Sequence, residues 1–133
     1  MNKFFLLFFP LFLFAVPVIF PFTVELKKDQ SAYFDVYYSE RTYSFKFRWT
    51  LYINDILTVH YRYDNFPRQV ELYNTPPLNA FKVPIAKIPE NYPYFYVEFK
   101  NFNGTIATFD IYLLNDRKNV KVDYKGKKWD ILK

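Results

Sequence analysis

The chain of 133 residues contains no cysteine, only two glycines and a single histidine. Without cysteine there are no disulfides, no thiol catalysis, no cysteine-ligated zinc and no lipid attached to a cysteine. The glycines, Gly104 and Gly126, are too few and too far apart for the loops that bind phosphates or dinucleotides. A fold of this composition has to be stable through packing alone, and we expect it to need no cofactor.

Catalytic candidates are equally sparse. His60 alternates with Thr58 and Arg62 on the outward side of its segment, where one histidine beside an arginine makes a poor metal site. A hydrolase that uses His60 stays an alternative, because such sites are set by geometry, but no nucleophile elbow accompanies it. The thirteen acidic residues are spread singly, without an evident pair or a calcium-binding loop. We therefore predict a protein that is not an enzyme and holds no metal.

The N-terminus is the longest apolar stretch of the chain. Phe4 to Phe22 carries no polar side chain, and Lys3 is the only charge before it. This run is longer than the centre of a signal peptide, about 7–15 residues, and close to the ~20 residues of a membrane-spanning helix. Three prolines within it disfavour a helix and favour a cleaved signal. Against cleavage, the run contains no A-x-A-like site, and Ala15 is its only small residue. The alternative is an uncleaved anchor that attaches residues 4–22 to the membrane.

Both interpretations predict export, either to the periplasm or to the inner membrane with the domain facing the periplasm. The surplus of Phe, Tyr, Asn, Lys and Ile is typical of an AT-rich bacterial genome. The division that we expect is a signal or anchor at 1–22, a folded domain at 23–124 and a basic tail at 125–133. About 110 residues are enough for one domain with a single core.

Aromatic residues make up 24% of the chain and favour β-strands. The clearest alternation lies in residues 43–50, and weaker copies predict strands near 32–38, 56–63, 70–72, 81–88, 94–100, 107–113 and 120–124. Asn103-Gly104 is the preferred pair for a two-residue type I′ hairpin turn, and Asp64 to Arg68 reads as a turn that contains proline. The predicted inward residues of the clearest segment are Tyr43, Phe45, Phe47 and Trp49; the outward ones are Ser44, Lys46, Arg48 and Thr50.

Seven to nine short strands without a helical period predict an all-β fold, an antiparallel β-sandwich of immunoglobulin-like architecture. A small OB-like barrel is the alternative.

Two groups of residues are candidates for contact with a partner. The first consists of tyrosines on predicted outward faces, because tyrosine is enriched at protein interfaces. The second is the C-terminal tail: the net charge of +5 arises entirely within Arg117 to Lys133, and residues 1–116 are neutral. The candidate residues are Tyr73, Tyr94, Tyr96 and Tyr112 in the first group, and Lys125, Lys127, Lys128 and Trp129 in the second.

These features predict a non-enzymatic, exported interaction domain that binds protein partners in the cell envelope, as an accessory subunit of a larger assembly. A carbohydrate-binding module is one alternative, because surface aromatics can stack on sugar rings. A protein that binds single-stranded nucleic acid is another, in which Lys46, Arg48, Arg62 and Tyr96 would combine charge with stacking. We do not expect nucleic acid as the partner, because the body of the chain is neutral and export separates it from most nucleic acid.

Overall fold

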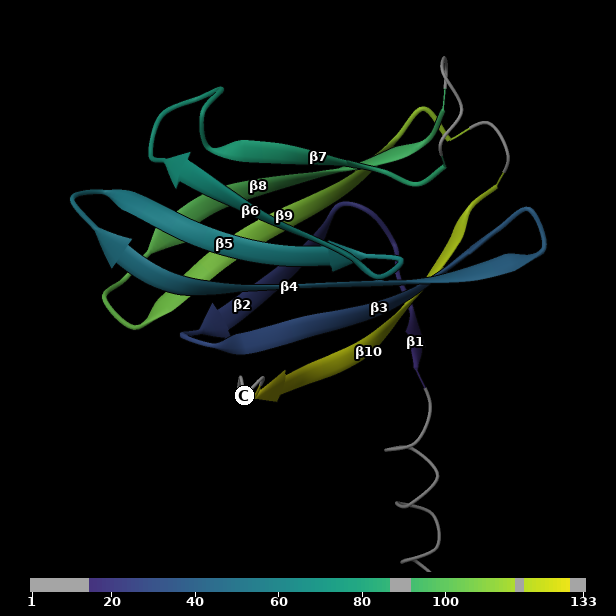
Figure 1. The fold of residues 1–133 in the computed structure, drawn as a ribbon, viewed down its shortest axis with the longest axis horizontal. Helices are drawn as coiled ribbons and strands as arrows, with labels where there is room; N and C mark the ends of the chain where they lie inside the picture. Colours follow the sequence, from purple (N-terminus) through teal and green to yellow (C-terminus); the bar gives the residue numbers. More distant parts are fainter. Residues whose placement is uncertain (1–14, 87–91, 117–118, 130–133) are drawn as a thin grey trace, which may run out of the picture.

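The computed structural model describes residues 15–86, 92–116 and 119–129, and in these the chain is all-β. Two antiparallel sheets pack face to face as a sandwich (Figure 1). Sheet A has the order β1 (Val16–Pro17), β10 (Lys121–Trp129), β3 (Gln30–Tyr38), β4 (Arg41–Ile53), β5 (Ile56–Tyr63) and β6 (Phe66–Tyr73). Sheet B has the order β2 (Phe22–Lys27), β9 (Ile106–Leu114), β8 (Tyr94–Phe102) and β7 (Ala80–Pro84).

This arrangement confirms the prediction of an antiparallel sandwich. The OB-like barrel was wrong, because the described strands divide into two sheets, each with its own pair of edges. Alternating apolar residues bury one face of each sheet, and these two faces meet to form the core. Phe45 stacks on Phe95 of sheet B with ring centroids 5.0 Å apart, and Phe47 meets Phe109 edge to face at 5.1 Å.

Trp49 closes one end of this core. Its indole Nε1 donates a hydrogen bond of 2.7 Å to the carbonyl oxygen of Leu26, and its ring packs edge-on against Phe102. Because Leu26 belongs to β2 and Trp49 to β4, this bond joins the two sheets. A buried indole usually finds such an acceptor, and here the acceptor fixes how β2 lies against sheet A.

Two-residue turns connect β3, β4, β5 and β6 in succession. Ser39-Glu40, Asn54-Asp55 and Asp64-Asn65 all have positive φ at both positions, as type I′ turns require. The last of these corrects the prediction of a turn over Asp64 to Arg68: the chain reverses within two residues, and Pro67 already lies in β6. Pro67 is tolerated there because β6 is an edge strand.

The hairpin between β8 and β9 has a different turn from the predicted two-residue one. Phe102 is paired with Ala107, so residues 103–106 lie between the paired positions. Gly104 has a φ of 102°, but Asn103 does not have a positive φ, which a type I′ turn needs. The Asn103 carboxamide oxygen instead accepts hydrogen bonds from the backbone N–H groups of Thr105 and Ile106. The side chain of Asn103 therefore shapes the turn.

A β-bulge at Thr50 changes which residues of β4 face outward. Trp49 is paired with Val59 and Leu51 with Thr58, so Thr50 is the extra residue. Beyond it the alternation reverses, and Leu51 and Ile53 reach the surface with exposed fractions of 45% and 53%. Before the bulge the apolar residues alternate as predicted, but Arg48, which was predicted to be on the solvent-exposed face, is only 7% exposed.

Candidate binding surfaces

Three of the four candidate tyrosines lie together on the outer face of sheet B. Tyr94 and Tyr96 come from β8, and Tyr112 of β9 is directly opposite Tyr96, with ring centroids 6.2 Å apart. The ammonium of Lys82 lies 5.0 Å from the centroid of the Tyr94 ring. All three tyrosines are half-buried, and we call this group the tyrosine face. Tyr73 is not part of it, because it lies in β6 of sheet A, where its exposed fraction is 43%.

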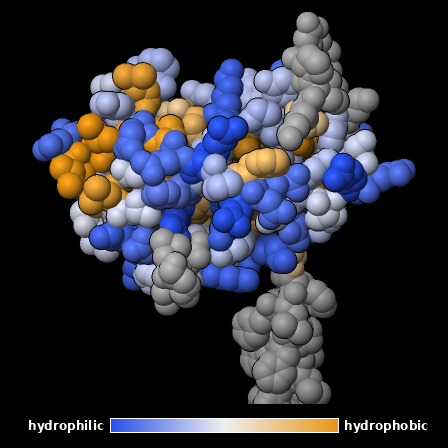
Figure 2. All heavy atoms as spheres, viewed as in Figure 1, coloured by the Kyte–Doolittle hydropathy of each residue, from blue (hydrophilic) through white to orange (hydrophobic). Residues whose placement is uncertain are grey.

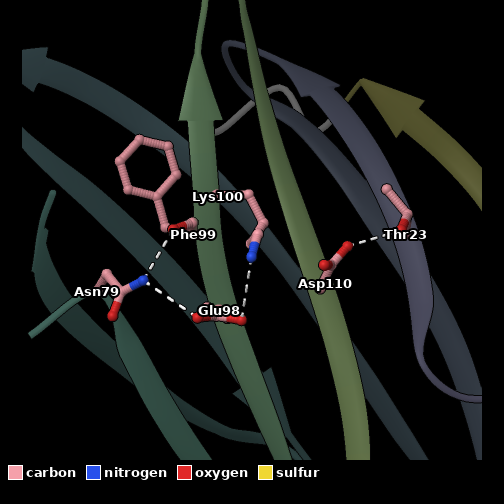
Figure 3. A network of polar contacts seen from close by, with 6 residues as sticks. All are labelled: Thr23, Asn79, Glu98, Phe99, Lys100 and Asp110. Carbon is pink, nitrogen blue, oxygen red and sulfur yellow. Dashed lines mark hydrogen bonds and ion pairs between the residues drawn. The ribbon is translucent and has the colours of Figure 1, made fainter. Parts of the chain in front are cut away.

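Two carboxylates continue the tyrosine face. Glu98 and Asp110 are opposite each other on β8 and β9, two residues along from Tyr96 and Tyr112 (Figure 3). The hydroxyl of Thr23 donates a 2.6 Å hydrogen bond to Asp110. The face thus combines aromatic area with hydrogen-bond acceptors.

Neighbouring side chains orient Glu98 as well. Asn79 donates from its amide nitrogen to Glu98 at 3.4 Å, and the Lys100 ammonium forms an ion pair with Glu98 at 3.7 Å (Figure 3). Asn79 also donates to the carbonyl oxygen of Phe99, so its own amide is fixed. No pair of carboxylates is evident in the sequence, because Glu98 and Asp110 become neighbours only through the register of β8 and β9.

The predicted basic tail continues the last strand. β10 runs through Trp129, beyond the predicted end at Tyr124, and the register shift between Tyr124 and Gly126 marks a bulge at Lys125. The bulge places the Lys125 ammonium 3.5 Å from a carboxylate oxygen of Asp35. The tail residues before Asp130 are therefore part of sheet A.

The remaining basic residues of β10 point to different places. Lys127 donates to the backbone carbonyl of Glu25 at 3.2 Å, at the border with sheet B. The ammonium of Lys128 lies 4.9 Å from the centroid of the Tyr33 ring, on the outer face of sheet A. Trp129 is 57% exposed at the end of the strand. The structure does not bring the four candidate residues of the tail into one site.

An aromatic cleft lies between the sheets, near the start of β6 and the end of β7. Two adjoining hollows of about 390 and 300 Å³ share Tyr63, Phe66 and Pro84 in their walls. The hydroxyl of Tyr63 donates a 2.8 Å hydrogen bond to the carbonyl oxygen of Ile85, and its ring stacks on Tyr43. Burial raises the pKa of Tyr63 far above its ordinary value, so this hydroxyl stays protonated and forms a fixed part of the wall.

The bulge in β4 creates an exposed apolar patch that the alternation in the sequence does not predict. Leu51, Ile53, Tyr73 and Leu78 are all exposed, and they lie near the β4–β5 turn and the segment after β6. Figure 2 shows hydrophobic residues gathered at this end of the molecule. The patch belongs to sheet A and the segment after it, and is separate from the tyrosine face.

His60 lies in the middle of β5, half-buried on the outer face of sheet A, opposite Arg48. Among the described residues, no group of three or more histidine, aspartate or glutamate side chains is placed to hold a metal ion. Within the same residues, no helix is long and apolar enough to cross a membrane. The predicted signal or anchor falls mostly on residues 1–14, which lie outside the described part.

Comparison of the chain with protein-family models, with curated proteins and with solved structures gave no match.

Proposed function

We propose that this chain is a non-enzymatic interaction domain of the cell envelope, and that a protein partner binds to the tyrosine face. The observation that carries the proposal is the pairing of Tyr96 with Tyr112, flanked by Tyr94 on one side and by the Glu98–Asp110 carboxylates on the other. Tyrosine supplies apolar contact area at a low entropic cost, and its hydroxyl forms hydrogen bonds. The carboxylates favour a partner surface that carries lysine, arginine or backbone N–H groups.

Export is the second part of the proposal, and the start of the folded domain indicates where a signal peptide would end. Val18, Phe20 and Phe22 pack against the core, and β1 begins at Val16. Cleavage after Ala15 would leave every described strand complete, whereas cleavage at residue 22 would remove part of the core packing. We therefore place the signal at residues 1–15, shorter than the 22 residues of the sequence prediction.

Cleavage after Ala15 makes a direct prediction. Intact-mass analysis of the tagged protein from the cell envelope is expected to show a chain that begins at Val16. The matched control is Ala15→Asp, which places a charge at the cleavage position and is expected to leave the chain full length. A wild-type protein that retains residues 1–15 would instead support the uncleaved anchor.

We propose a likeness to immunoglobulin domains that is limited to the packing of the two sheets. Two packed antiparallel sheets and the buried Trp49 between them support it. The strand order is different, since β3 to β6 form a run of four strands that are neighbours both in sequence and in the sheet, unlike the ABED and CFG sheets of immunoglobulin domains.

A partner that binds the tyrosine face should be lost when that face is changed. Tyr96→Ala is expected to reduce recovery of co-purifying envelope proteins about 30-fold, the effect of an interface residue worth about 2 kcal/mol. The measurement is quantitative mass spectrometry after gentle solubilisation of the envelope, with the wild-type chain and the variant tagged in the same way.

Tyr73→Ala is the matched control, because it removes a tyrosine that lies in sheet A, away from the tyrosine face. It is expected to retain the partners. Equal recovery with Tyr96→Ala and the wild type would reject the tyrosine face as the binding surface.

Carbohydrate binding is the second candidate for the same surface. The arrangement of the Tyr96 and Tyr112 rings beside Glu98 and Asp110 favours it, because sugar rings pack on aromatic faces while their hydroxyls donate to carboxylates. A glycan array distinguishes the two: retention of a glycan by the wild type and its loss in Tyr96→Ala would favour this candidate over a protein partner.

A further inference from the structure

Strand β6 forms one edge of sheet A. Among the described strands it pairs with β5 alone. The two-residue turn before β6 makes Tyr63 and Phe66 a hydrogen-bonded pair, and such pairs alternate with non-bonded ones along an antiparallel ladder. Every second residue of β6, from Pro67 to Tyr73, therefore directs its backbone groups away from β5.

The backbone bond of Tyr73 agrees with this alternation. Its N–H donates to the carbonyl oxygen of Leu78 at 3.0 Å, and Leu78 is not part of β5. The segment after β6 thus covers the end of the strand. Within the described part of the chain, no such backbone bond covers the outward side of Gln69 or Glu71. Outward N–H and C=O groups of this kind can pair with a further strand.

Pro67 limits this edge without closing it. A proline has no N–H to donate, and proline is one of the means by which proteins protect an edge strand. The carbonyl of Pro67 still points outward, and Gln69 and Glu71 each present both a donor and an acceptor. The stretch that can pair with another strand therefore runs from Pro67 to Glu71.

The inner side of this edge adjoins the aromatic cleft. The smaller of its two hollows, about 300 Å³, is lined by Tyr61, Tyr63 and Arg68 of sheet A and by Val83 of β7, among others. An apolar cavity of about 150 Å³ already holds benzene, so this hollow has room for a phenylalanine ring. In a strand added beside β6, alternate side chains would point to the inner side, and the one beside Arg68 would enter the hollow.

The outer side of the same stretch has opposite charges at its two ends. Arg62 is exposed and is paired with Pro67, so a residue beside Pro67 in an added strand would meet Arg62 across the short proline ring. Glu71 is exposed at the other end. Hydrogen bonds from Thr58 first, and then from Gln69, lower the pKa of Glu71 and keep it ionised. Charge complementarity favours an acidic residue beside Pro67 and a basic one beside Glu71.

We propose that the edge of β6 binds an extended peptide segment of a partner protein and adds it to sheet A as a further strand. The segment carries an acidic residue beside Pro67, a large apolar residue beside Arg68 and a basic residue beside Glu71. Backbone hydrogen bonds supply the affinity in this mode of recognition, and the alternate side chains supply the specificity. The surface shares no residue with the tyrosine face, which belongs to sheet B, so the two proposals stand or fall separately.

Fluorescein-labelled peptides test the proposal on the purified full chain in an uncharged detergent. The peptide Asp-Phe-Thr-Val-Lys has the required order for a parallel strand, and Lys-Val-Thr-Phe-Asp has it for an antiparallel one. One of the two is expected to bind saturably in fluorescence anisotropy. Replacing its Asp by Lys should weaken binding about fivefold, the effect of an exposed ion pair. Arg62→Gln should remove this difference between the two peptides.

Gln69→Pro tests the backbone pairing, because it removes an outward N–H from the edge. It is expected to weaken binding of the peptide about tenfold. Gln69→Ala is the matched control, since it removes the same side chain but keeps the N–H, and it should bind like the wild type. Tyr96→Ala should also leave binding unchanged.

A variant that does not fold leaves a second measurement. The amide resonances of Gln69 and Glu71 in the wild-type chain are expected to shift more than those of the tyrosine face when the peptide is added. The proposal is overturned if neither peptide binds saturably, or if Gln69→Pro folds and binds as well as Gln69→Ala. A wild-type dimer that Gln69→Pro dissociates would also overturn it, because a second copy of the chain would then occupy the edge.

Discussion

Phe47→Ala is expected to lower the free energy of unfolding by about 3–5 kcal/mol, the usual cost of truncating a buried phenylalanine. The ring of Phe47 is 1% exposed and contacts Phe34 and Phe45 in its own sheet. It also meets Phe81 and Phe109 of sheet B edge to face. Because Phe47 touches both layers, its removal leaves a cavity that neither sheet alone can fill. Urea denaturation followed by tryptophan fluorescence measures the loss.

Phe66→Ala is the matched control for this prediction. Phe66 lies at the start of β6 in the same sheet, and 52% of it is exposed. Its truncation is expected to cost no more than about 1 kcal/mol, because surface substitutions have small effects. If the total stability is near the lower end of 5–15 kcal/mol, Phe47→Ala will unfold the domain, and Phe47→Leu then gives the measurable intermediate. Equal losses in Phe47→Ala and Phe66→Ala would contradict the packing that we describe.

Alkaline solution is expected to destabilise the domain steeply. Burial raises the pKa values of Tyr61, Tyr63 and Tyr124 above the ordinary value of 10.0. The folded chain therefore keeps these phenolic protons at pH values where the unfolded chain has lost them. The stability that they contribute is fully present below pH 10 and is lost as the pH rises above it, by up to about 1.4 kcal/mol per pH unit for Tyr63. The loss is smaller for Tyr61 and Tyr124, because water screens these more exposed groups. Urea midpoints between pH 8 and pH 11 would show this fall.

Tyr63→Phe separates this effect from the ionisation of lysines. The variant loses the hydrogen bond to Ile85 and should be about 1 kcal/mol less stable at pH 8. Above pH 10 its stability should fall less steeply than that of the wild type, because one buried phenol is gone. Parallel curves for the two proteins over the whole range would mean that Tyr63 does not contribute to the alkaline loss. Tyr73→Phe, at an exposed tyrosine, controls for the substitution itself.

The inward faces of the strands could be predicted from the sequence, because alternation depends on neighbouring residues alone. Phe45, Phe47 and Trp49 are buried as predicted. Predictions failed where the chain departs from strict alternation or where the turn depends on more than two residues. The bulge at Thr50 has no marker in the sequence, and Pro67 suggested a turn although an edge strand accepts it.

The candidate surfaces could not be predicted from the sequence, because they depend on the register with which the strands pair. Alternation placed Tyr96 and Tyr112 on outward faces, but only the pairing of β8 with β9 shows that they are opposite each other. The same holds for sheet A: Lys46 and Arg62 were predicted to point outward, but only the pairing of β4 with β5 places them opposite each other. Sequence spacing gives no information on contacts between residues that are far apart in the chain.

The position of β10 limits when this domain can finish folding. Short turns join β3 to β6, so these strands pair with near neighbours and can form a meander early. Among the described residues β10 is the last strand, yet it lies inside sheet A between β1 and β3. Because the chain is synthesised from its N-terminus, the edge of β3 stays unpaired until residues 121–129 have been made. During synthesis the edge of β3 stays exposed until β10 has emerged, and this is the interval in which a chaperone would have to protect the nascent protein.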